Sequence, residues 1–388
     1  MEKNLSNQFI RWYNNVFRQD SIFTTLLGCT EGSPWHREDN VGIHTDMVVS
    51  EYLAITSGND WTQDDLLGAL ACAFHDVGKP RASERNGVKF KPERGNYLSF
   101  SGHEQISARF WEDYVATNWI ELQKTFDLVP FDIFAVGWMI EHHLPWGVKK
   151  TDKVKQIAQT AMFIDPTVFT NFLLADTYGR ISDDEIEKRQ KVGDWVYNLV
   201  SEIIPRQVVN DTDPKFGQPR LILPVGVSGA GKSTLQPQFS THEHYSWDDL
   251  RLELYLTDEE KELIGTEVDM STAYGATFKR SCEDKNFSKK INSRFMELIR
   301  AEKDIYVDNT NLSKKRRRFF VQEARRKGYF IQAILLPASI ETVLNRQQSR
   351  PDKTVPLDAV MNQYMSLQYP SFGEVDDIIV EKGNLPKG

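Results

Sequence analysis

A glycine-rich segment of the chain carries the residue types that bind phosphate groups. Residues 226–234 read Gly-Val-Ser-Gly-Ala-Gly-Lys-Ser-Thr and follow an apolar run. Glycines let backbone N–H groups approach phosphate oxygens closely, and a helix that starts here presents its N-terminus to the anion. The lysine supplies a positive charge for the β- and γ-phosphates, and the serine hydroxyl ligates Mg²⁺. The predicted nucleotide-binding residues are Gly226, Gly229, Gly231, Lys232, Ser233 and Thr234. The predicted cofactors are ATP, or another nucleoside triphosphate, and Mg²⁺.

Carboxylates and arginines further along the chain are those that phosphoryl transfer to a hydroxyl group requires. Residues 246–251 read Ser-Trp-Asp-Asp-Leu-Arg, and residues 308–312 read Asp-Asn-Thr-Asn-Leu. Arg346 and Arg350 are four residues apart, on one face of a predicted helix. A carboxylate accepts the proton of the attacking hydroxyl group, while arginines neutralise the transferred phosphoryl group and hold the acceptor. Asp248 has a second interpretation, as a helix cap or first-turn carboxylate.

The order of these motifs resembles the kinase domain of phage-type 5′-hydroxyl polynucleotide kinases, over nearly all of residues 220–370. The resemblance implies that Asp248 is the general base for the 5′-hydroxyl group. It implies that Arg251 contacts the 3′ phosphate of the acceptor and that Arg350 binds the donor phosphates and the transition state. The further residues implied at the nucleotide and at the acceptor are Arg346 and Asn311, respectively.

The roles of two features of this region are left open by the sequence. The D-T-N-L motif of the resembled family reads Asn309–Leu312 here, with the acid one place earlier at Asp308. The role of the usual aspartate is therefore open in this chain. The run Lys314–Arg318 reads Lys-Lys-Arg-Arg-Arg. It is either a solvated helix face or a contact for nucleic acid.

A second set of chemically active residues lies in the N-terminal part, where His75 is followed directly by Asp76 in Ala-Phe-His-Asp-Val-Gly-Lys. An adjacent His-Asp pair at a helix end can bind one metal ion with both side chains. His44, about one helix upstream, and the late Asp176 can complete the site. Imidazole and carboxylate ligands suit Mn, Fe, Co, Ni, Cu or Zn more than Ca²⁺. A lone His-Asp pair, by contrast, is usually a satisfied core histidine or a helix cap.

The ordered pattern H…HD…D, with Gly-His-Glu and Glu-His-His between, resembles the HD phosphohydrolase superfamily from about His44 to Arg180. The resemblance implies a metal-dependent phosphohydrolase, with Lys79 stabilising a phosphoryl oxygen. The implied metal ligands are His44, His75, Asp76 and Asp176. The residues implied to bind a second metal ion or to hold the phosphate are His103 and either His142 or His143. His36 lies before the pattern and is assigned no role.

The order of the two domains, with the HD-type domain before the kinase-type domain, resembles the HD-Pnk type of bifunctional nucleic-acid end-healing enzyme. They imply ATP-dependent phosphorylation of 5′-hydroxyl ends and hydrolysis of 2′,3′-cyclic phosphate, or of 2′ or 3′ phosphate, on RNA or DNA ends, with a separate ligase acting downstream. A small-molecule nucleoside or sugar kinase fused to a nucleotidase is the alternative. A nucleotide-switched binding module with a degenerate HD fold is a third. Arg251 favours the first, because a bare nucleoside has no 3′ phosphate to contact.

The elements expected to position these residues change along the chain. Helical spacing of apolar residues predicts helices over Asp46–Thr56, Gln63–Phe74, His103–Thr117 and Asp132–His142. Residues 80–101 are predicted to be a loop. Strands alternating with helices are expected after residue 220, at Leu221–Val225, Lys303–Val307 and Tyr329–Leu336. The sequence thus predicts an all-α HD-type domain over residues 1–205, a linker over 206–219, and an α/β P-loop kinase domain with a parallel sheet over 220–388.

Composition limits the remaining possibilities. The 388 residues carry a net charge of −8, which argues against a protein that coats nucleic acid. Residues 219–388 hold 25 Lys/Arg and 24 Asp/Glu, whereas residues 1–218 hold 22 and 31, so the acidity lies in the N-terminal part. No membrane-crossing run and no signal-peptide pattern is expected. Three scattered cysteines favour a reducing cytosol. The oligomeric state is left open, a homo-oligomer included.

Overall fold

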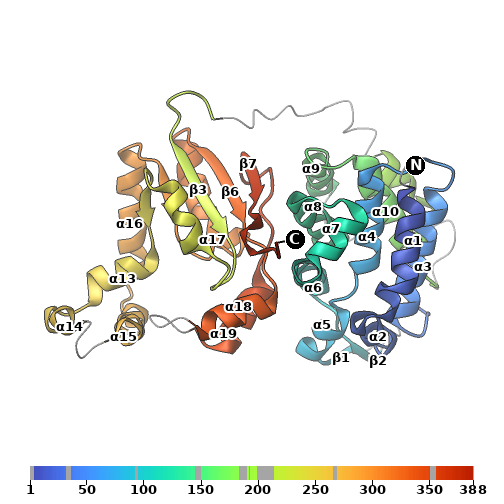
Figure 1. Ribbon diagram of the computed structural model, residues 1–388, viewed down its shortest axis with the longest axis horizontal. Coiled ribbons are helices and arrows are strands. Elements are labelled where there is room, and N and C mark those ends of the chain that lie inside the picture. Colours follow the sequence, from blue (N-terminus) through green and yellow to red (C-terminus); the bar gives the residue numbers. More distant parts are fainter. Residues whose placement is uncertain are drawn as a thin grey trace. The chain divides into compact units, whose positions relative to one another are not determined.

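The computed structural model describes residues 4–31, 36–91, 95–144, 150–182, 190–191, 193–198, 214–264, 269–349 and 355–387. The chain forms two compact units. The N-terminal unit is Met1–Asn210 with Pro386–Gly388, and the C-terminal unit is Asp211–Leu385. The predicted fold class is confirmed: a mainly helical region is followed by an α/β unit with a parallel sheet (Figure 1). The predicted linker lies outside the described residues as far as residue 213, so its bounds stay a prediction.

Helices build the N-terminal unit around one almost fully buried helix, α4. Every residue of α4 from Leu66 to Phe74 is buried, and the helix packs against α3, α8 and α10. Thr62 and Asp65 form a capping box that fixes where α4 starts. The helices are α1 (Leu5–Asn15), α2 (Ser21–Leu27), α3 (Val41–Ile55), α4 (Gln63–Phe74), α5 (Lys79–Asn86), α6 (His103–Thr117), α7 (Trp119–Phe126), α8 (Pro130–Glu141), α9 (Lys150–Thr160) and α10 (Pro166–Tyr178).

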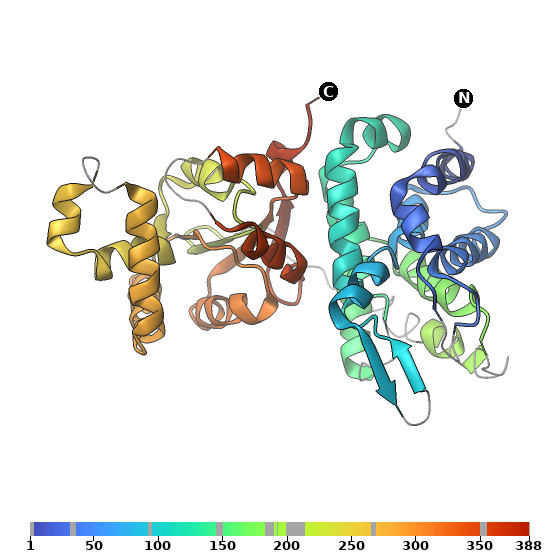
Figure 2. The same ribbon diagram turned by 90° about the horizontal axis from the view of Figure 1, so that it is seen from below.

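The prediction of a loop over residues 80–101 is wrong. This stretch contains most of α5 and an antiparallel hairpin of β1 (Val88–Lys91) and β2 (Gly95–Leu98). The hairpin protrudes from the helices (Figure 2), and every residue of β1 is exposed. Residues 88–91 (Val-Lys-Phe-Lys) do alternate apolar and polar residues, but four residues with no buried face are too short a pattern to indicate a strand by themselves.

The C-terminal unit contains a five-stranded sheet in the order β4-β5-β3-β6-β7, in which all neighbours are parallel. The strands are β3 (Arg220–Val225), β4 (Glu243–Tyr245), β5 (Ile305–Val307), β6 (Phe330–Leu335) and β7 (Asp377–Val380). The helices are α12 (Lys232–Leu235), α13 (Trp247–Tyr255), α14 (Asp258–Leu263), α15 (Met270–Glu283), α16 (Phe287–Arg300), α17 (Lys314–Arg326), α18 (Ile340–Gln348) and α19 (Leu357–Ser366). Because the strands are parallel, their carboxyl ends meet at one edge, which is where such sheets bind ligands.

Pro224 lies in the central strand β3, where a proline cannot donate a ladder hydrogen bond. The pairing of β3 with β5 extends from Leu221 to Ile222 and stops before the proline. The Pro224 carbonyl instead accepts a hydrogen bond from the side-chain amide of Asn311. The pairing of β3 with β6 continues through Pro224 to Val225, so the missing ladder bonds lie on the β5 side of the strand.

Candidate active sites

Three buried side chains from separate helices converge in the N-terminal unit. His44 lies in α3, His75 at the end of α4 and Asp176 in α10. The Nε2 atoms of the two histidines are 3.3 Å apart. Asp176 Oδ1 lies 3.3 Å from His44 Nε2 and 3.8 Å from His75 Nε2. This spacing matches a set of ligand atoms arranged around a single metal ion.

Asp76 lies between this group and a second one. Its Oδ2 is 3.2 Å from His75 Nε2 and 3.5 Å from His44 Nε2. Its Oδ1 is 3.0 Å from His103 Nε2 and 3.9 Å from His143 Nε2. Asp76, His103 and His143 form a second buried group with metal-ligand spacing. One carboxylate thus offers an oxygen to each group.

The tautomers of the four histidines are set by the backbone. In each ring Nδ1 lies within hydrogen-bond distance of a main-chain carbonyl, so in the neutral ring the proton sits on Nδ1 and Nε2 has its lone pair free. The pairs are His44 with Gly179, His75 with Cys72, His103 with Phe100, and His143 with Ile140. All four Nε2 atoms therefore face the groups described above as potential ligands.

This arrangement fits metal ions and is poorly satisfied without them. In that tautomer the lone pairs of His44 and His75 face each other, and the Nε2 atoms of His103 and His143 are likewise 3.3 Å apart. Both oxygens of Asp76 are buried among these rings, and Oδ2 also lies 2.8 Å from the ammonium of Lys79. Buried acceptors without donors are costly. A cation among these atoms would satisfy all of them.

The charges in this region agree with such a role. Burial opposes ionisation of Asp76, but His75 and Lys79 outweigh it and hold its pKa well below the usual range. Burial, with His103 and His75 nearby, lowers the pKa of His143 to about 3, so that ring is neutral. Burial also disfavours the charged form of His44, yet hydrogen bonds to Asp176 and Glu38 raise its pKa to about 9. A metal ion would displace that extra proton.

Lys79, predicted to stabilise a phosphoryl oxygen, is buried and doubly paired. Its Nζ lies 2.6 Å from Glu31 Oε2 and 2.8 Å from Asp76 Oδ2. The two carboxylates raise the pKa of Lys79 despite its burial, so the ammonium keeps its charge beside the candidate metal site. Its contact with a substrate stays a prediction.

Glu38, which the sequence did not indicate, contacts both His44 and His36. Glu38 Oε1 lies 3.1 Å from His44 Nδ1 and 2.7 Å from His36 Nδ1, and Oε2 accepts a hydrogen bond from the Ile181 backbone. Glu38 therefore connects His44 of α3 to the segment that follows α10. The only local signal was its place in the short polar stretch before α3.

The structure places the two alternative residues His142 and His143 differently. His143 joins the second group, whereas His142 stacks on Trp138 with ring centroids 3.6 Å apart. Nδ1 of His142 is also within hydrogen-bond distance of the Trp138 carbonyl, at 2.9 Å. Adjacent residues at a helix end point in different directions, so one of the two faces the site.

In the C-terminal unit, the predicted phosphate-binding loop connects β3 to α12. Gly229 and Gly231 have φ values of 94° and 99°, which favour glycine. A Cβ on Gly229 would also lie 2.9 Å from Nε2 of Gln347. Lys232 Nζ donates to the carbonyls of Gly226 and Val227 at 3.0 and 2.8 Å, so the ammonium lies inside the loop.

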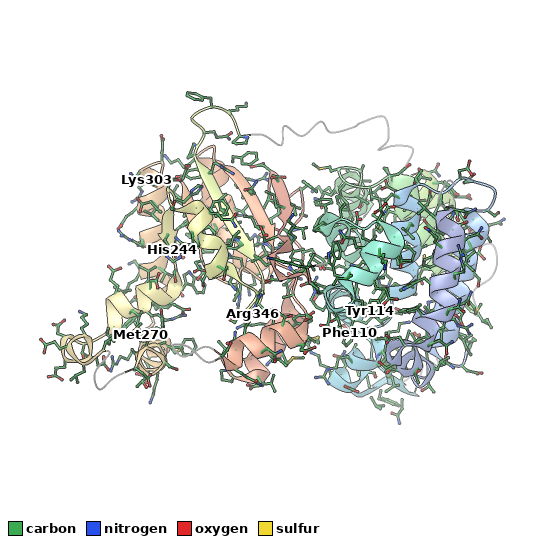
Figure 3. All side chains as sticks on the ribbon, in the orientation of Figure 1. Phe110, Tyr114, His244, Met270, Lys303 and Arg346 are labelled. Atoms are coloured by element: carbon green, nitrogen blue, oxygen red, sulfur yellow. The ribbon has the colours of Figure 1, made fainter. Side chains whose placement is uncertain are left out.

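C-terminal elements support this loop from outside. Arg346, labelled in Figure 3, donates to the Gly229 carbonyl and to Asn384 Oδ1. Asn384 Nδ2 donates in turn to the Ala230 carbonyl. Arg346 therefore contacts the predicted nucleotide loop, and its contact with a bound nucleotide stays a prediction. Arg350 lies outside the described residues, and Ser233 and Thr234 are exposed.

Asp248 lies in the first turn of α13, directly after β4. Ser246 supplies the cap by accepting from the Asp249 backbone, so Asp248 is not the cap residue. Its Oδ1 instead accepts from Arg251 Nη1 at 2.6 Å. Ser281 of α15 accepts from Arg251 Nε at 3.1 Å. The predicted base and the predicted acceptor-binding arginine thus form one pair at the carboxyl edge of the sheet.

The displaced acid Asp308 has a histidine partner. Nε2 of His244, labelled in Figure 3, lies 3.2 Å from Asp308 Oδ2, and its Nδ1 lies 3.2 Å from Asp249 Oδ2. Hydrogen bonds to these two carboxylates raise the pKa of His244 to about 9. Asn309 stands where the resembled family has its aspartate, and its Oδ1 accepts from the Trp247 backbone at the start of α13.

Asn311 and the basic run are placed as follows. Asn311 is buried at φ 48°, and its amide donates to the carbonyls of Pro224, Val307 and Asn309. These bonds join β3 to the end of β5, and contact with the acceptor stays a prediction. In the run Lys314–Arg318, Arg317 is fully buried and pairs with Glu374 at 2.8 Å, whereas the other four side chains are exposed.

Comparison with known proteins agrees with the geometry of the C-terminal unit. A family model described as an AAA domain matches residues 221–370, which contain the phosphate-binding loop and most of the sheet. A P-loop kinase-like domain of this kind binds a nucleoside triphosphate with Mg²⁺. Within the described ranges, every helix is too short or too polar to cross a bilayer.

One curated protein similar to this chain comes from Autographa californica nuclear polyhedrosis virus and is named "Putative bifunctional polynucleotide kinase/RNA ligase". The two are 24% identical over 187 residues. The match covers 47% of this chain and 25% of the viral protein, so the chain spans about a quarter of that relative's length.

Proposed function

We propose that this chain is a nucleic-acid end-healing enzyme with two activities. Its C-terminal unit phosphorylates 5′-hydroxyl ends of RNA or DNA with ATP. Its N-terminal unit is an HD-type phosphohydrolase that hydrolyses 2′,3′-cyclic phosphate, or 2′ or 3′ phosphate, at the other end. The observation that carries the kinase half is the Asp248–Arg251 pair at the edge of the sheet that holds the phosphate-binding loop. The name of the viral relative supports the same substrate class. A separate ligase would join the healed ends.

In the kinase reaction Asp248 accepts the proton of the 5′-hydroxyl group. The freed oxygen attacks the γ-phosphorus of ATP, and ADP leaves. Lys232 and the loop N–H groups stabilise the charge on the transferred phosphoryl group. Arg251 donates to the Asp248 carboxylate and holds the acceptor's 3′ phosphate. Ser233 would hold Mg²⁺, and Arg350 remains the predicted arginine for the transition state.

In the phosphoesterase reaction His44, His75, Asp76 and Asp176 would hold one divalent transition-metal ion. Asp76, His103 and His143 would hold a second. A metal ion bound there supplies hydroxide near neutral pH and polarises a phosphoryl oxygen. The backbone carbonyls hold the proton of each neutral ring on Nδ1, as at His75, and Lys79 adds a positive charge beside Asp76.

Transfer of labelled phosphate from ATP tests the kinase half. The protein should label a 5′-hydroxyl oligonucleotide and leave free nucleosides unlabelled. Asp248→Asn should slow the transfer by about 10²–10⁴-fold, the usual contribution of a general base. Asp258→Asn, at an exposed carboxylate that pairs with Lys261, is the matched control. Labelling of nucleosides in place of the oligonucleotide would favour a small-molecule kinase.

A metal panel tests the phosphoesterase half. An oligonucleotide ending in a 2′,3′-cyclic phosphate is incubated with the protein after chelation and again with Mn²⁺, Co²⁺, Ni²⁺ or Zn²⁺. Hydrolysis should require one of these ions and disappear in Asp76→Asn. Hydrolysis at full rate in that variant would remove Asp76 from the proposed site.

A further inference from the structure

An exposed aromatic ring lies beside the candidate kinase site. The guanidinium carbon of Arg251 lies 5.1 Å from the ring centroids of both Phe278 and Phe287. Arg251 Nη1 donates to Asp248, and its Nε donates to Ser281. One guanidinium group therefore contacts both phenyl rings and the proposed general base.

The two rings differ in their surroundings. Phe287 at the start of α16 is 9% exposed, so it is part of the packed interior. Phe278 in α15 is 53% exposed. The face of α15 that packs inward carries Ala273, Thr277 and Ser281, and Phe278 lies next to it. Its contact with Arg251 covers part of the ring and leaves more than half of the side chain open.

This placement suits the base of a nucleotide. A nucleotide that presents its 5′ oxygen to Asp248 and its 3′ phosphate to Arg251 carries its base on the sugar between them. An exposed ring adjacent to Arg251 is within the span of that nucleotide. Stacking on an aromatic ring tolerates any base, because every base has a π face.

We propose that Phe278 stacks on the 5′-terminal base of the acceptor strand and so favours polynucleotide ends over other hydroxyl groups. This inference rests on the proposed kinase function. Arg251 lies against the same ring and fixes its position, so the stacking surface is formed before the acceptor binds.

Two acceptors separate base stacking from a purely structural role of the ring. The first is a 5′-hydroxyl oligonucleotide, and the second is the same oligonucleotide with an abasic 5′-terminal residue. Phe278→Ala should raise KM for the first by about 5- to 100-fold, the range expected for losing one base stack. KM for the abasic acceptor and kcat for both should change little. Phe278→Trp should restore the low KM.

Two controls accompany this variant. Phe216→Ala makes the same substitution at an exposed phenylalanine of the same unit that precedes β3, at the end of the strand opposite the phosphate-binding loop. It should leave both KM values unchanged. In the unmodified protein, KM for the abasic acceptor should be as high as the KM of Phe278→Ala for the intact oligonucleotide. This comparison tests the stack without any substitution.

Three results would overturn the inference. If Phe278→Ala raised KM equally for both acceptors, the ring would only support Arg251. Unchanged KM values on both would mean that the ring does not touch the acceptor. Absence of transfer by the unmodified protein to either acceptor would overturn the proposed kinase function, and this inference with it.

Discussion

The proton on each histidine of the N-terminal site is fixed by a backbone carbonyl. His75 shows the principle: its Nδ1 is held by the Cys72 carbonyl one turn back in the same helix, and Nε2 is turned to Asp76 and His44. Ligand atoms held in advance lose little freedom when a metal ion binds. The geometry of this site is therefore set by helix ends more than by loops.

Nδ1 of His44 lies 3.1 Å from a carboxylate oxygen of Glu38, and this gives a prediction for Glu38. Glu38→Gln keeps the size of the side chain and removes the charge that orients His44. Loss of such a partner typically weakens metal affinity about 10–100-fold. Titration of the metal-free protein with Co²⁺ measures the change. Asp39→Asn, at the exposed neighbour, is the control. Equal affinities of the two variants would contradict this role.

His244 gives a prediction about pH. Its pKa is raised to about 9 by Asp249 and Asp308, whereas burial lowers the pKa of His242 two residues earlier. NMR titration should place the midpoint of His244 near 9 and that of His242 below 6.5. Asp249→Asn should lower the His244 midpoint, while Asp258→Asn should not. A midpoint near 6.5 for His244 would contradict its pairing with both carboxylates.

The same shift gives the sign of a stability effect. The folded-state pKa of His244 is raised above the usual histidine value of 6.5. Its contribution to stability is therefore fully present below pH 6.5 and is lost as pH rises through about 9. The group is half-exposed, so solvent screening keeps the contribution small. The difference in urea midpoint between the protein and His244→Gln should shrink over that pH range.

Side chains with local signals could be predicted, and those with distant partners could not. The glycine loop, His75–Asp76 and the pair Asp248 and Arg251 are short motifs whose spacing carries the chemistry. Glu31 pairs with Lys79, which lies 48 residues away in the chain. Glu38 accepts from a backbone group 143 residues away. The residues next to Glu31 and Glu38 in the sequence give no indication of such distant contacts.

At the scale of elements, the candidate metal site depends on how closely α6 approaches the end of α4. Gly78 lies in the turn between α4 and α5, and its N–H donates to Ser107 of α6 at 2.9 Å. A Cβ on Gly78 would lie 2.5 Å from the Ser107 nitrogen and 2.6 Å from the His103 carbonyl. Glycine is therefore needed here for space, because its φ of −83° is open to any residue.

Gly78→Ala should push α6, and with it His103, away from Asp76. We expect a loss of roughly 1–3 kcal/mol in stability, as for other overpacked sites, together with weaker metal binding. Thermal unfolding and metal stoichiometry measure the two effects. Gly28→Ala is the control, since its nearest contact would be an ordinary 3.5 Å. Full metal binding by the Gly78 variant would contradict the close approach.

The longer elements could be predicted from periodicity, and the short ones could not. Helices α4 and α6 match the predicted bounds, because their apolar residues repeat over several turns. Strand β4 has three residues, of which Glu243 and His244 are exposed, and β7 has four. Such segments contain too few residues for a pattern. β4 nevertheless positions Asp248, so the sequence indicated the residue and not the strand that places it.

At the scale of the whole molecule, the chain consists of two compact units that each carry one candidate site. We therefore expect the two activities to be separable by single substitutions in the full-length protein. His75→Ala should abolish hydrolysis of the 2′,3′-cyclic phosphate and leave 5′ phosphorylation intact. Lys232→Ala should do the reverse. In each variant, the activity that is retained shows that the unit without the substitution is folded. Equal loss of both activities in either variant would contradict separate sites.

The most direct test uses one RNA oligonucleotide with a 5′-hydroxyl group and a 2′,3′-cyclic phosphate. It is incubated with the full-length protein, ATP, Mg²⁺ and one transition metal at a time, and both ends are identified by mass spectrometry. We expect the 5′ end to gain a phosphate and the cyclic phosphate to be opened or removed, the second change requiring the transition metal. An oligonucleotide with both ends unchanged in the presence of every metal would contradict the proposed function.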